Sequence, residues 1–590
     1  MTKNEFTLLY TILKHGVQPF REMSAMNGLS LGYISQQMNM FRRKGWTDEK
    51  GIIDDGMEAL RPYKVDNAVI MAAGLSTRFV PLSLEKPKGL LEVKGEVLIE
   101  RQIRQLKSAG IDEIILVLGY KKEAFFYLEN KYEGLHIVIN TAYNLKNNPY
   151  TLYCARGFLG NSYICSSDDY FVENPFEDYV YSSYYSGVRV SEHTDEWYMI
   201  SDSKGNIAGV QTGGRDGTIM LGHAYWNREF SAAMLKLISD DQSTGYYDQV
   251  LWEKILADNL KKLPPMSIRV YPPEIIFEFD SLDDLRRFDI RYIYDTHSRI
   301  MSNITQSLKC EQSDILNFRS IKEGLTNTSF VFEVKGQQYV YRHPGEGTEK
   351  IISRSHEKKA LTMAREIGAD PTFICMDENE GWKLSYFVPD IRVPYYKNHE
   401  DSLRVISVMQ KLHRRALHAE WAFLPWEEAL RIETILREQK GGIADRDFDD
   451  LKAAVKLCCD RTSGDGVEMC FCHCDTYAPN WMLTPDGRTI LIDWEYAGEA
   501  DPGCDVGTYI MDSLWTVDEA DVFIRDYCAE DYDDHLRFHY LAYTAIVSYY
   551  WYVWALYREY CGAVMGESLY NWRTMAKKYS EYLVKAYSLS

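Results

Sequence analysis

The stretch Asn67-Ala68-Val69-Ile70-Met71-Ala72-Ala73-Gly74-Leu75-Ser76-Thr77-Arg78 decides the fold of the middle part of this chain. Its apolar run is typical of a buried strand, and the glycine that follows indicates a turn. A strand that enters a glycine-rich turn exposes backbone N–H groups that can cradle phosphates. We therefore predict a nucleotide-binding turn made by Ala72, Ala73, Gly74, Ser76 and Thr77.

Two basic residues strengthen this interpretation. Arg78 closes the turn, and Lys88 follows in Lys86-Pro87-Lys88. Both can neutralise the charge on a triphosphate and on a leaving pyrophosphate, so we predict that they are catalytic residues of a nucleotidyl transferase. The alternative is an ordinary strand-to-helix turn with basic residues on the surface.

The residues after this turn alternate between strands and helices. Apolar runs at 114–118 and 136–139 indicate strands, and 98–109 has helical spacing. This rhythm predicts a Rossmann-like α/β domain over residues 63–295 with a mostly parallel sheet. Sites in such sheets lie at the carboxyl ends of the strands.

A second signature, His473-x-Asp475-x-x-x-x-Asn480, lies far along the chain. Asp475 is placed to accept the proton of an attacking hydroxyl, and Asn480 to bind Mg²⁺. Asp493 follows an apolar run and would hold the metal that bridges ATP phosphates. Cys474 replaces the Arg of protein kinases, and Asp493 lacks a following Phe-Gly. The pattern favours a kinase of small molecules.

The second signature lies in a predicted bilobal, protein-kinase-like α+β domain over residues 296–590. A hairpin at 329–342 and a helix at 352–366 belong to its smaller lobe, at about 318–392. The larger lobe, at about 393–590, has mostly helical spacing.

Residues 1–62 form a small α(+β) unit with three predicted helices and a short hairpin, which resembles a winged helix-turn-helix. The third helix carries polar side chains that can contact bases or phosphates: Ser35, Gln36, Gln37, Asn39, Arg42 and Arg43. The charge of this unit is roughly balanced, unlike that of typical DNA-binding domains. The sequence therefore leaves open whether the unit contacts DNA or a regulatory protein.

Length and composition set the remaining limits. The 590 residues predict three or four domains, and the net charge of −20 argues against wide nucleic-acid binding. The N-terminus lacks the apolar run of a signal peptide, and Leu541–Tyr557 is short for a bilayer span, so we expect no membrane span. Twelve scattered cysteines favour a reducing cytoplasm.

With these motifs, residues 68–288 resemble the bacterial CTP:phosphocholine cytidylyltransferases, within the sugar-nucleotide pyrophosphorylase group. The resemblance implies Mg²⁺ bound by Asp168 and Asp280. It also makes three residues candidates for binding a quaternary ammonium by charge and cation–π contacts: Trp197, Asp248 and Trp252. The chain departs from the family at Ser76, where a second Gly is usual, and at Ser166, where another Asp is frequent.

Residues 321–590 resemble the choline kinases, through Gly324-Leu325-Thr326-Asn327, Tyr341-Arg342 and Ile492 to Tyr496. The resemblance implies nucleotide binding by Asn327 and by Arg342, with Glu357 as the ion-pair partner of Arg342. Three aromatic residues, Tyr496, Trp551 and Trp554, are candidates for a cage around a trimethylammonium group.

Together the two signatures predict a bifunctional cytoplasmic enzyme. One half phosphorylates choline with ATP, and the other couples phosphocholine to CTP, which gives CDP-choline and pyrophosphate. Two alternatives stay open: the same reactions on ethanolamine or another amino alcohol, and a DNA-binding regulator that uses the enzyme domains as sensors. The sequence does not define the oligomeric state.

Overall fold

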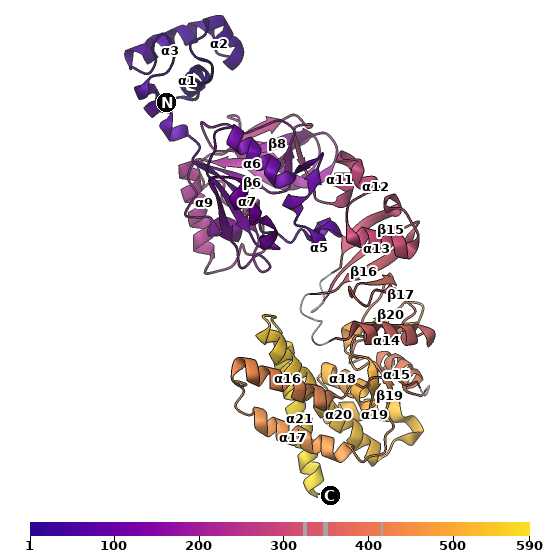
Figure 1. Ribbon diagram of the computed structural model, residues 1–590. Coiled ribbons are helices and arrows are strands. Elements are labelled where there is room, and N and C mark those ends of the chain that lie inside the picture. The colour runs from indigo at the N-terminus through magenta and orange to yellow at the C-terminus, as the bar shows by residue number, and fades with distance from the viewer. Residues whose placement is uncertain (322–326, 346–351, 415–416, 590) are drawn as a thin grey trace. The chain divides into compact units, whose positions relative to one another are not determined.

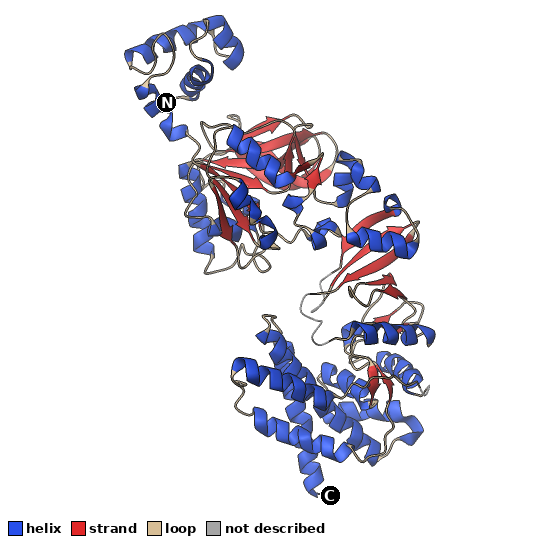
Figure 2. Ribbon diagram, viewed as in Figure 1, coloured by secondary structure: helices blue, strands red, loops and turns tan. Residues whose placement is uncertain are grey.

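The computed structural model describes residues 1–321, 327–345, 352–414 and 417–589. The chain divides into two compact units, Met1–Ser320 and Ile321–Ser590. Figure 1 follows the chain from the N-terminus to the C-terminus, and Figure 2 shows where helices and strands lie.

The first 62 residues form three helices, as predicted, namely α1 (Lys3–His15), α2 (Phe20–Asn27) and α3 (Leu31–Arg43), followed by α4 (Asp54–Leu60). The predicted hairpin is reduced to a single antiparallel bridge between Thr47 and Ile52. On α3, Gln37 is buried, whereas the other polar candidates are exposed or half-buried. Helix α1 is tied to the following domain, because the Tyr10 hydroxyl donates to Asp178 at 2.8 Å.

The sheet of the middle domain ends in four parallel strands, in the order β6 (Ser162–Ser166), β1 (Asn67–Ala72), β4 (Ile114–Leu118) and β5 (Leu135–Ile139), with β5 at the edge. Strand β11 (Gly217–Trp226) continues the sheet antiparallel to β6 and carries β8 (Tyr184–Val190) and β9 (Thr194–Ser201). Strand β10 (Ile207–Gly214) pairs with β9, and β12 (Ser267–Tyr271) with β8.

Helices cover both faces of this sheet (Figure 2). Alternate residues of β1 point to opposite faces. Ile70 packs in one core with α6 (Leu98–Ser108), and Val69 packs in another with α9 (Arg228–Asp241). Burial on both faces explains why the strand sequences are continuously apolar.

The segment after residue 295, predicted as the start of the kinase domain, lies with the first unit. Its helix α13 (Arg299–Leu308) begins at the carboxylate of Glu85, which accepts from the backbone N–H of Arg299 at 2.8 Å and of Ile300 at 3.3 Å. Arg286 donates to the carbonyl of Ile315 at 2.6 Å. These bonds join residues 296–320 to the domain before them.

The second unit begins with an antiparallel sheet in which β15 (Thr328–Val334), β16 (Gln337–His343), β18 (Lys383–Tyr386) and β17 (Phe373–Met376) are neighbours in that order. The predicted hairpin turns at Lys335-Gly336, where both residues have positive φ. Helix α14 (Arg354–Glu366) follows, close to the predicted range.

The rest of the second unit is mainly helical, as predicted. Helix α20 (Asp534–Tyr560) contains the apolar stretch Leu541–Tyr557, which is buried in the core. The other helices around this core are α15 (His399–His413), α16 (Pro425–Lys440), α17 (Phe448–Thr462), α18 (Gly503–Ser513), α19 (Val517–Cys528) and α21 (Glu567–Leu589). In the part of the chain that the structure describes, no helix has the length and apolar character of a membrane span.

Candidate active sites

A cleft of about 750 Å³ lies where β1 and β6 end, at the carboxyl edge of the parallel strands. Strand β1 enters it through the glycine-rich turn, so this is the edge at which α/β sheets bind ligands. Among the residues predicted from the sequence, those lining the cleft are Ala72, Ala73, Gly74, Ser76, Thr77, Arg78, Lys88, Asp168, Trp197, Trp252 and Asp280.

Ser76 has a left-handed backbone conformation, with φ of 51°. Glycine adopts this region without a steric penalty, whereas most other residues do so rarely. This conformation gives a physical reason for a glycine at this place in related sequences. The serine therefore changes side-chain size at the turn while the backbone keeps the shape that a glycine would favour.

Lys88 and the predicted metal ligands form one charged cluster. The Lys88 ammonium is 7% exposed and lies 2.6 Å from Asp168 Oδ2 and 3.8 Å from Asp280 Oδ1. Arg78 reaches Asp280 Oδ1 at 3.3 Å from the outer side of the cleft. Burial alone would raise the pKa of Asp168, but the adjacent Lys88 ammonium outweighs it and lowers that pKa. Asp168 is therefore ionised at neutral pH.

Asp169 is a member of this cluster that the sequence analysis did not single out. It lies on β7 (Asp169–Phe171), opposite Glu278 on β13 (Ile276–Glu278). Burial, and then the Glu278 and Asp168 carboxylates, raise its pKa well above the usual range. Both Asp169 oxygens and Asp168 Oδ1 are buried without a hydrogen-bond partner among the described residues. Unpartnered carboxylate oxygens fit a site that binds a hard cation.

Aromatic side chains also line the cleft. Trp197 is half-buried there, while Trp252 is only 2% exposed and stacks on Tyr185 with ring centroids 5.4 Å apart. Glu253, next to Trp252, accepts from the Tyr185 hydroxyl at 3.0 Å and was missed by the sequence analysis. Asp248 does not line the cleft; it forms an ion pair with Lys146 at 3.0 Å.

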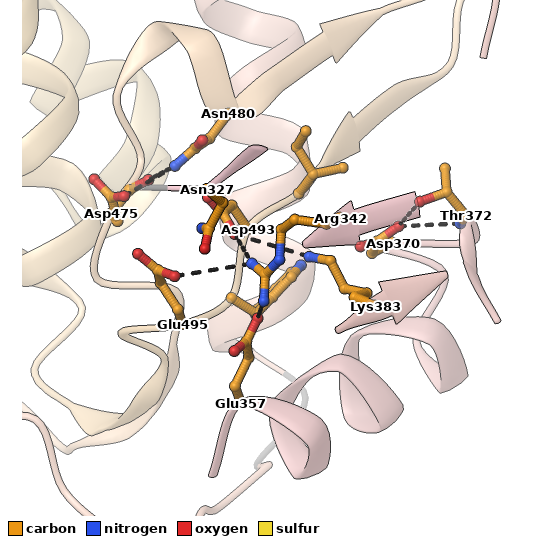
Figure 3. Close-up of polar contacts among 12 residues, drawn as sticks. Asn327, Arg342, Glu357, Asp370, Thr372, Lys383, Asp475, Asn480, Asp493 and Glu495 are labelled. Atoms are coloured by element: carbon orange, nitrogen blue, oxygen red, sulfur yellow. Dashed lines mark hydrogen bonds and ion pairs between the residues drawn. The ribbon is translucent and has the colours of Figure 1, made fainter. Parts of the chain in front are cut away.

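A second cavity, of about 440 Å³, lies in the second unit and contains the residues of the kinase signature. Asn480 donates from Nδ2 to Asp475 Oδ2 at 3.0 Å, which leaves its carbonyl oxygen as the potential cation ligand (Figure 3). Burial, and then the nearby Asp493 and Glu495 carboxylates, raise the pKa of Asp475 well above the usual range. A cation bound among these groups would favour the ionised form of Asp475.

The loop that contains His473 and Asp475 is held by Asp505, which the sequence analysis did not identify. Its carboxylate accepts from the backbone N–H of His473 at 3.0 Å and of Cys474 at 2.6 Å. His413 contacts the same carboxylate at 2.9 Å. Cys474 has a positive φ of 67°, a conformation that these bonds stabilise. Asp505 therefore fixes the loop that presents Asp475.

Arg342 and Glu357 form the predicted ion pair, and both are buried (Figure 3). Arg342 also contacts Asp493 Oδ1 at 2.7 Å. Single carboxylate oxygens of Glu357, Asp493 and Glu495 lie within 4.8 Å of one another, a separation that a shared cation could span. Asn327 lines the same cavity, whereas the predicted Gly324-Leu325-Thr326 lies outside the described residues.

Part of the lining of the second cavity is aromatic. Tyr496 and Trp551 meet edge to face with centroids 5.1 Å apart, and Trp551 is 5.4 Å from Trp554. Trp572, on α21, adds a fourth ring, 5.7 Å from Trp551, that the sequence analysis missed. All four rings line the cavity. Such a wall binds cations through ring faces.

Comparison with known proteins assigns each site to an enzyme class. Residues 317–541 match the phosphotransferase enzyme family, and residues 68–162 match the MobA-like NTP transferase domain. The chain is 34% identical over 226 residues to choline-phosphate cytidylyltransferase of Streptococcus pneumoniae, covering 38% of this chain and 96% of the relative.

Two further relatives extend the comparison. The chain is 35% identical over 231 residues to 2-aminoethylphosphonate cytidylyltransferase of Lancefieldella rimae, covering 39% of this chain and 94% of the relative. It is also 24% identical over 258 residues to protein LicA of Haemophilus influenzae, covering 41% of this chain and 74% of that protein. The chain is thus a transferase with a nucleotidyltransferase part and a phosphotransferase part.

Proposed function

This chain belongs, through its middle domain, to the family of the choline-phosphate cytidylyltransferases, and we propose that it makes CDP-choline in two consecutive steps. The kinase half transfers the γ-phosphate of ATP to choline. The middle domain then transfers CMP from CTP to phosphocholine and releases pyrophosphate.

One observation carries this proposal: each cavity combines a phosphate-handling cluster with an aromatic wall. The first cavity is lined by Trp197 together with the charged cluster around Lys88, and the second by Trp551 and Trp554 together with Asp475. A trimethylammonium group cannot donate hydrogen bonds, so ring faces and carboxylates are its natural partners. Both sites therefore suit the same quaternary-ammonium alcohol, once free and once phosphorylated.

In the proposed kinase step, Asp475 accepts the proton of the choline hydroxyl while the oxygen attacks the γ-phosphorus and ADP leaves. Asn480 orients Asp475 through its amide. Asp505 keeps the loop in place through its two backbone bonds. The aromatic wall holds the ammonium end, so that only the hydroxyl faces the phosphate.

In the proposed transferase step, a phosphocholine oxygen attacks the α-phosphorus of CTP. The turn from Ala72 to Thr77 offers its backbone to the phosphates, and Lys88 and Arg78 stabilise the charge that develops on the pyrophosphate. No covalent enzyme intermediate is required.

Mg²⁺, when bound, would neutralise phosphate charge in both sites, with Asp168 and Asp280 as its proposed ligands in the transferase, and Asn480 and Asp493 in the kinase. The unpartnered oxygen of Asp168 and the close carboxylates of Asp493 and Glu495 support this assignment.

The test is incubation of the purified full-length protein with choline, ATP, CTP and Mg²⁺, with products followed by mass spectrometry. We expect phosphocholine first and CDP-choline second. Asp475→Ala should lower phosphocholine formation by about 10²- to 10⁴-fold, yet still convert supplied phosphocholine. Lys88→Ala should show the reverse pattern. If each variant lost both reactions when choline and phosphocholine were supplied in separate assays, the separation into two sites would be wrong.

Ethanolamine supplied in place of choline tests the substrate class. A primary ammonium favours carboxylates and carbonyls over ring faces, so we expect choline to be preferred. Conversion of ethanolamine with choline left untouched would overturn the argument from the aromatic walls.

The role of residues 1–62 stays a prediction, either DNA contact or contact with a regulatory protein. Failure to shift duplex DNA at moderate salt would count against the regulator interpretation. We also propose a cytoplasmic location, supported by twelve cysteines scattered along the sequence and by reactions that use ATP and CTP.

A further inference from the structure

We propose that the second unit contains a thiolate metal site, in which His413, Cys470 and Cys472 bind a thiophilic cation of the Zn²⁺ class. His413 ends helix α15, the two cysteines lie on β19 (Cys470–Cys472), and the helix packs against that strand. The site differs from the carboxylate clusters proposed for Mg²⁺, because soft sulfur ligands select other metals than hard oxygen ligands do. It does not depend on the proposed kinase function.

The two thiols of β19 converge at the spacing that a tetrahedral metal requires. One residue separates them, so the alternation of the strand places both on the same face. Their Sγ atoms are 3.6 Å apart. Two sulfurs that each lie about 2.3 Å from a tetrahedral Zn²⁺ are about 3.8 Å apart, so little movement is needed to bind one. The bond from Cys472 Sγ to the Ala500 carbonyl, at 3.5 Å, is a weak one that a metal can replace.

His413 supplies the third ligand and already has the outer partner that such a ligand needs. A ring nitrogen of His413 and the two sulfur atoms all lie within 4.8 Å of one another. Its Nε2 is 2.9 Å from the carboxylate of Asp505, which can only accept, so Nε2 carries the ring hydrogen. Nδ1 of the neutral ring is then the metal ligand. Metal-binding histidines commonly donate their other N–H to a carboxylate in this way.

The local charge balance also suits a divalent cation. Two thiolates neutralise it, which is required where Cys470 is 7% exposed and Cys472 is fully buried. Burial raises the pKa of the Cys472 thiol well above its usual range, so the free site holds protonated thiols. Each bound cation therefore releases two thiol protons to the solvent. The Tyr527 hydroxyl, 2.7 Å from His413 Nδ1, must turn aside, and water fills the fourth position.

The site adjoins the loop that presents Asp475. His413 contacts the same Asp505 carboxylate that holds the backbone of this loop. A cation on Nδ1 polarises the ring and strengthens the donation from Nε2 to Asp505. The metal thus acts as a structural brace behind the loop and takes no part in the chemistry.

The experiment titrates chelator-treated full-length protein with Cd²⁺, a spectroscopic substitute for Zn²⁺, in excess Mg²⁺ and a thiol-free reductant. Mg²⁺ occupies oxygen sites, and the reductant keeps the sulfurs reduced. Thiolates bound to Cd²⁺ give a charge-transfer band in the ultraviolet, so its intensity counts the bound sulfurs. We expect saturation at about one Cd²⁺ per chain, a band of about two thiolates and the release of about two protons per cation. Excess Zn²⁺ should remove the band.

Three substitutions and a control locate the cation. Cys470→Ser and Cys472→Ser each remove one sulfur, so each should halve the band and weaken Cd²⁺ binding by more than about 100-fold, beyond the usual cost of losing an outer partner. Tyr527→Phe removes the hydroxyl that competes for Nδ1 and should bind Cd²⁺ at least as tightly as the wild type. Cys561→Ser, at an exposed position after α20, is the matched control and should change neither quantity.

The assignment is overturned if the wild type gives no thiolate band, or if band and affinity persist in both cysteine variants. Loss of the band in Cys561→Ser, or weaker binding by Tyr527→Phe, overturns it as well. Where a cysteine variant fails to fold, the wild-type proton count still decides, because binding without the release of two protons contradicts a dithiolate site. Absence of choline phosphorylation by the wild type would refute the proposed kinase function and leave this site unaffected.

Discussion

Replacement of Glu253 by Gln is expected to remove a fall in stability that the wild type shows between pH 5 and pH 8. Glu253 lines the transferase cleft next to Trp252, and its Oε2 is buried without a hydrogen-bond partner among the described residues. Burial raises its pKa from 4.5 to about 7. The folded protein therefore keeps this proton at a pH where the unfolded chain has released it.

The size of the effect follows from proton linkage. Because the pKa is higher in the folded state, the stabilising effect of the bound proton is fully present below pH 4.5 and is lost as pH rises through 7. Between pH 5 and pH 8 the loss amounts to roughly 2.5 kcal/mol. Gln has no proton to release, so the unfolding free energy of the variant lacks this part of the pH dependence.

Urea unfolding of the full-length wild type and of Glu253→Gln at pH 5, 6, 7 and 8 measures the difference. The relevant transition is the one that added CTP shifts, because a ligand stabilises the unit that binds it. Glu274→Gln, at an exposed position of the same domain, is the matched control. If the free energy of unfolding changed with pH in the same way for the wild type and for Glu253→Gln, the reasoning would be refuted. A buried carboxyl that ionises in this range must make the two pH dependences differ.

Two further substitutions test contacts outside the reacting groups. Asp445→Asn should weaken the bidentate ion pair with Arg573, which is adjacent to Trp572 in the sequence. We expect the KM for choline to rise by about tenfold while the KM for ATP stays unchanged. Equal rises in both KM values would contradict a role confined to the aromatic wall. Glu85→Gln should destabilise the first turn of α13 by about 1 kcal/mol, which hydrogen exchange over residues 299–308 measures. Because Glu85 lies three residues before Lys88, the variant should also lower the transferase rate and leave the kinase rate unchanged. Separate assays of the two reactions measure these rates.

Much of the local structure could be predicted from short-range patterns. The apolar run before Gly74 forms β1, as predicted, and the Ser30 hydroxyl caps α3 by accepting from the backbone N–H of Tyr33. The spacing from His473 to Asn480 predicted that Asp475 and Asn480 belong to one site, and the structure places Asn480 Nδ2 3.0 Å from Asp475 Oδ2. These features depend on neighbouring residues, so the sequence displays them directly.

Other members of the sites could not be found in this way. Asp169 belongs to the charged cluster because β7 pairs with β13, more than 100 residues later. Trp572 lines the kinase cavity because α21 packs on α20. Lys383 lies beside Arg342 because β18 pairs with β16 across an intervening helix. Two adjacent Asp residues at 168 and 169 were the one visible indication, and nothing local distinguished their roles.

The sequence by itself determined that one chain contains two phosphate-handling chemistries, because each depends on residue types at fixed, short spacings. The tertiary structure alone decided how charge is distributed among those residues. It paired Asp248 with Lys146 and placed Arg342 between the carboxylates of Glu357 and Asp493. The physical reason is that an ion pair depends on distance in space and on burial, and residues far apart in the chain set both.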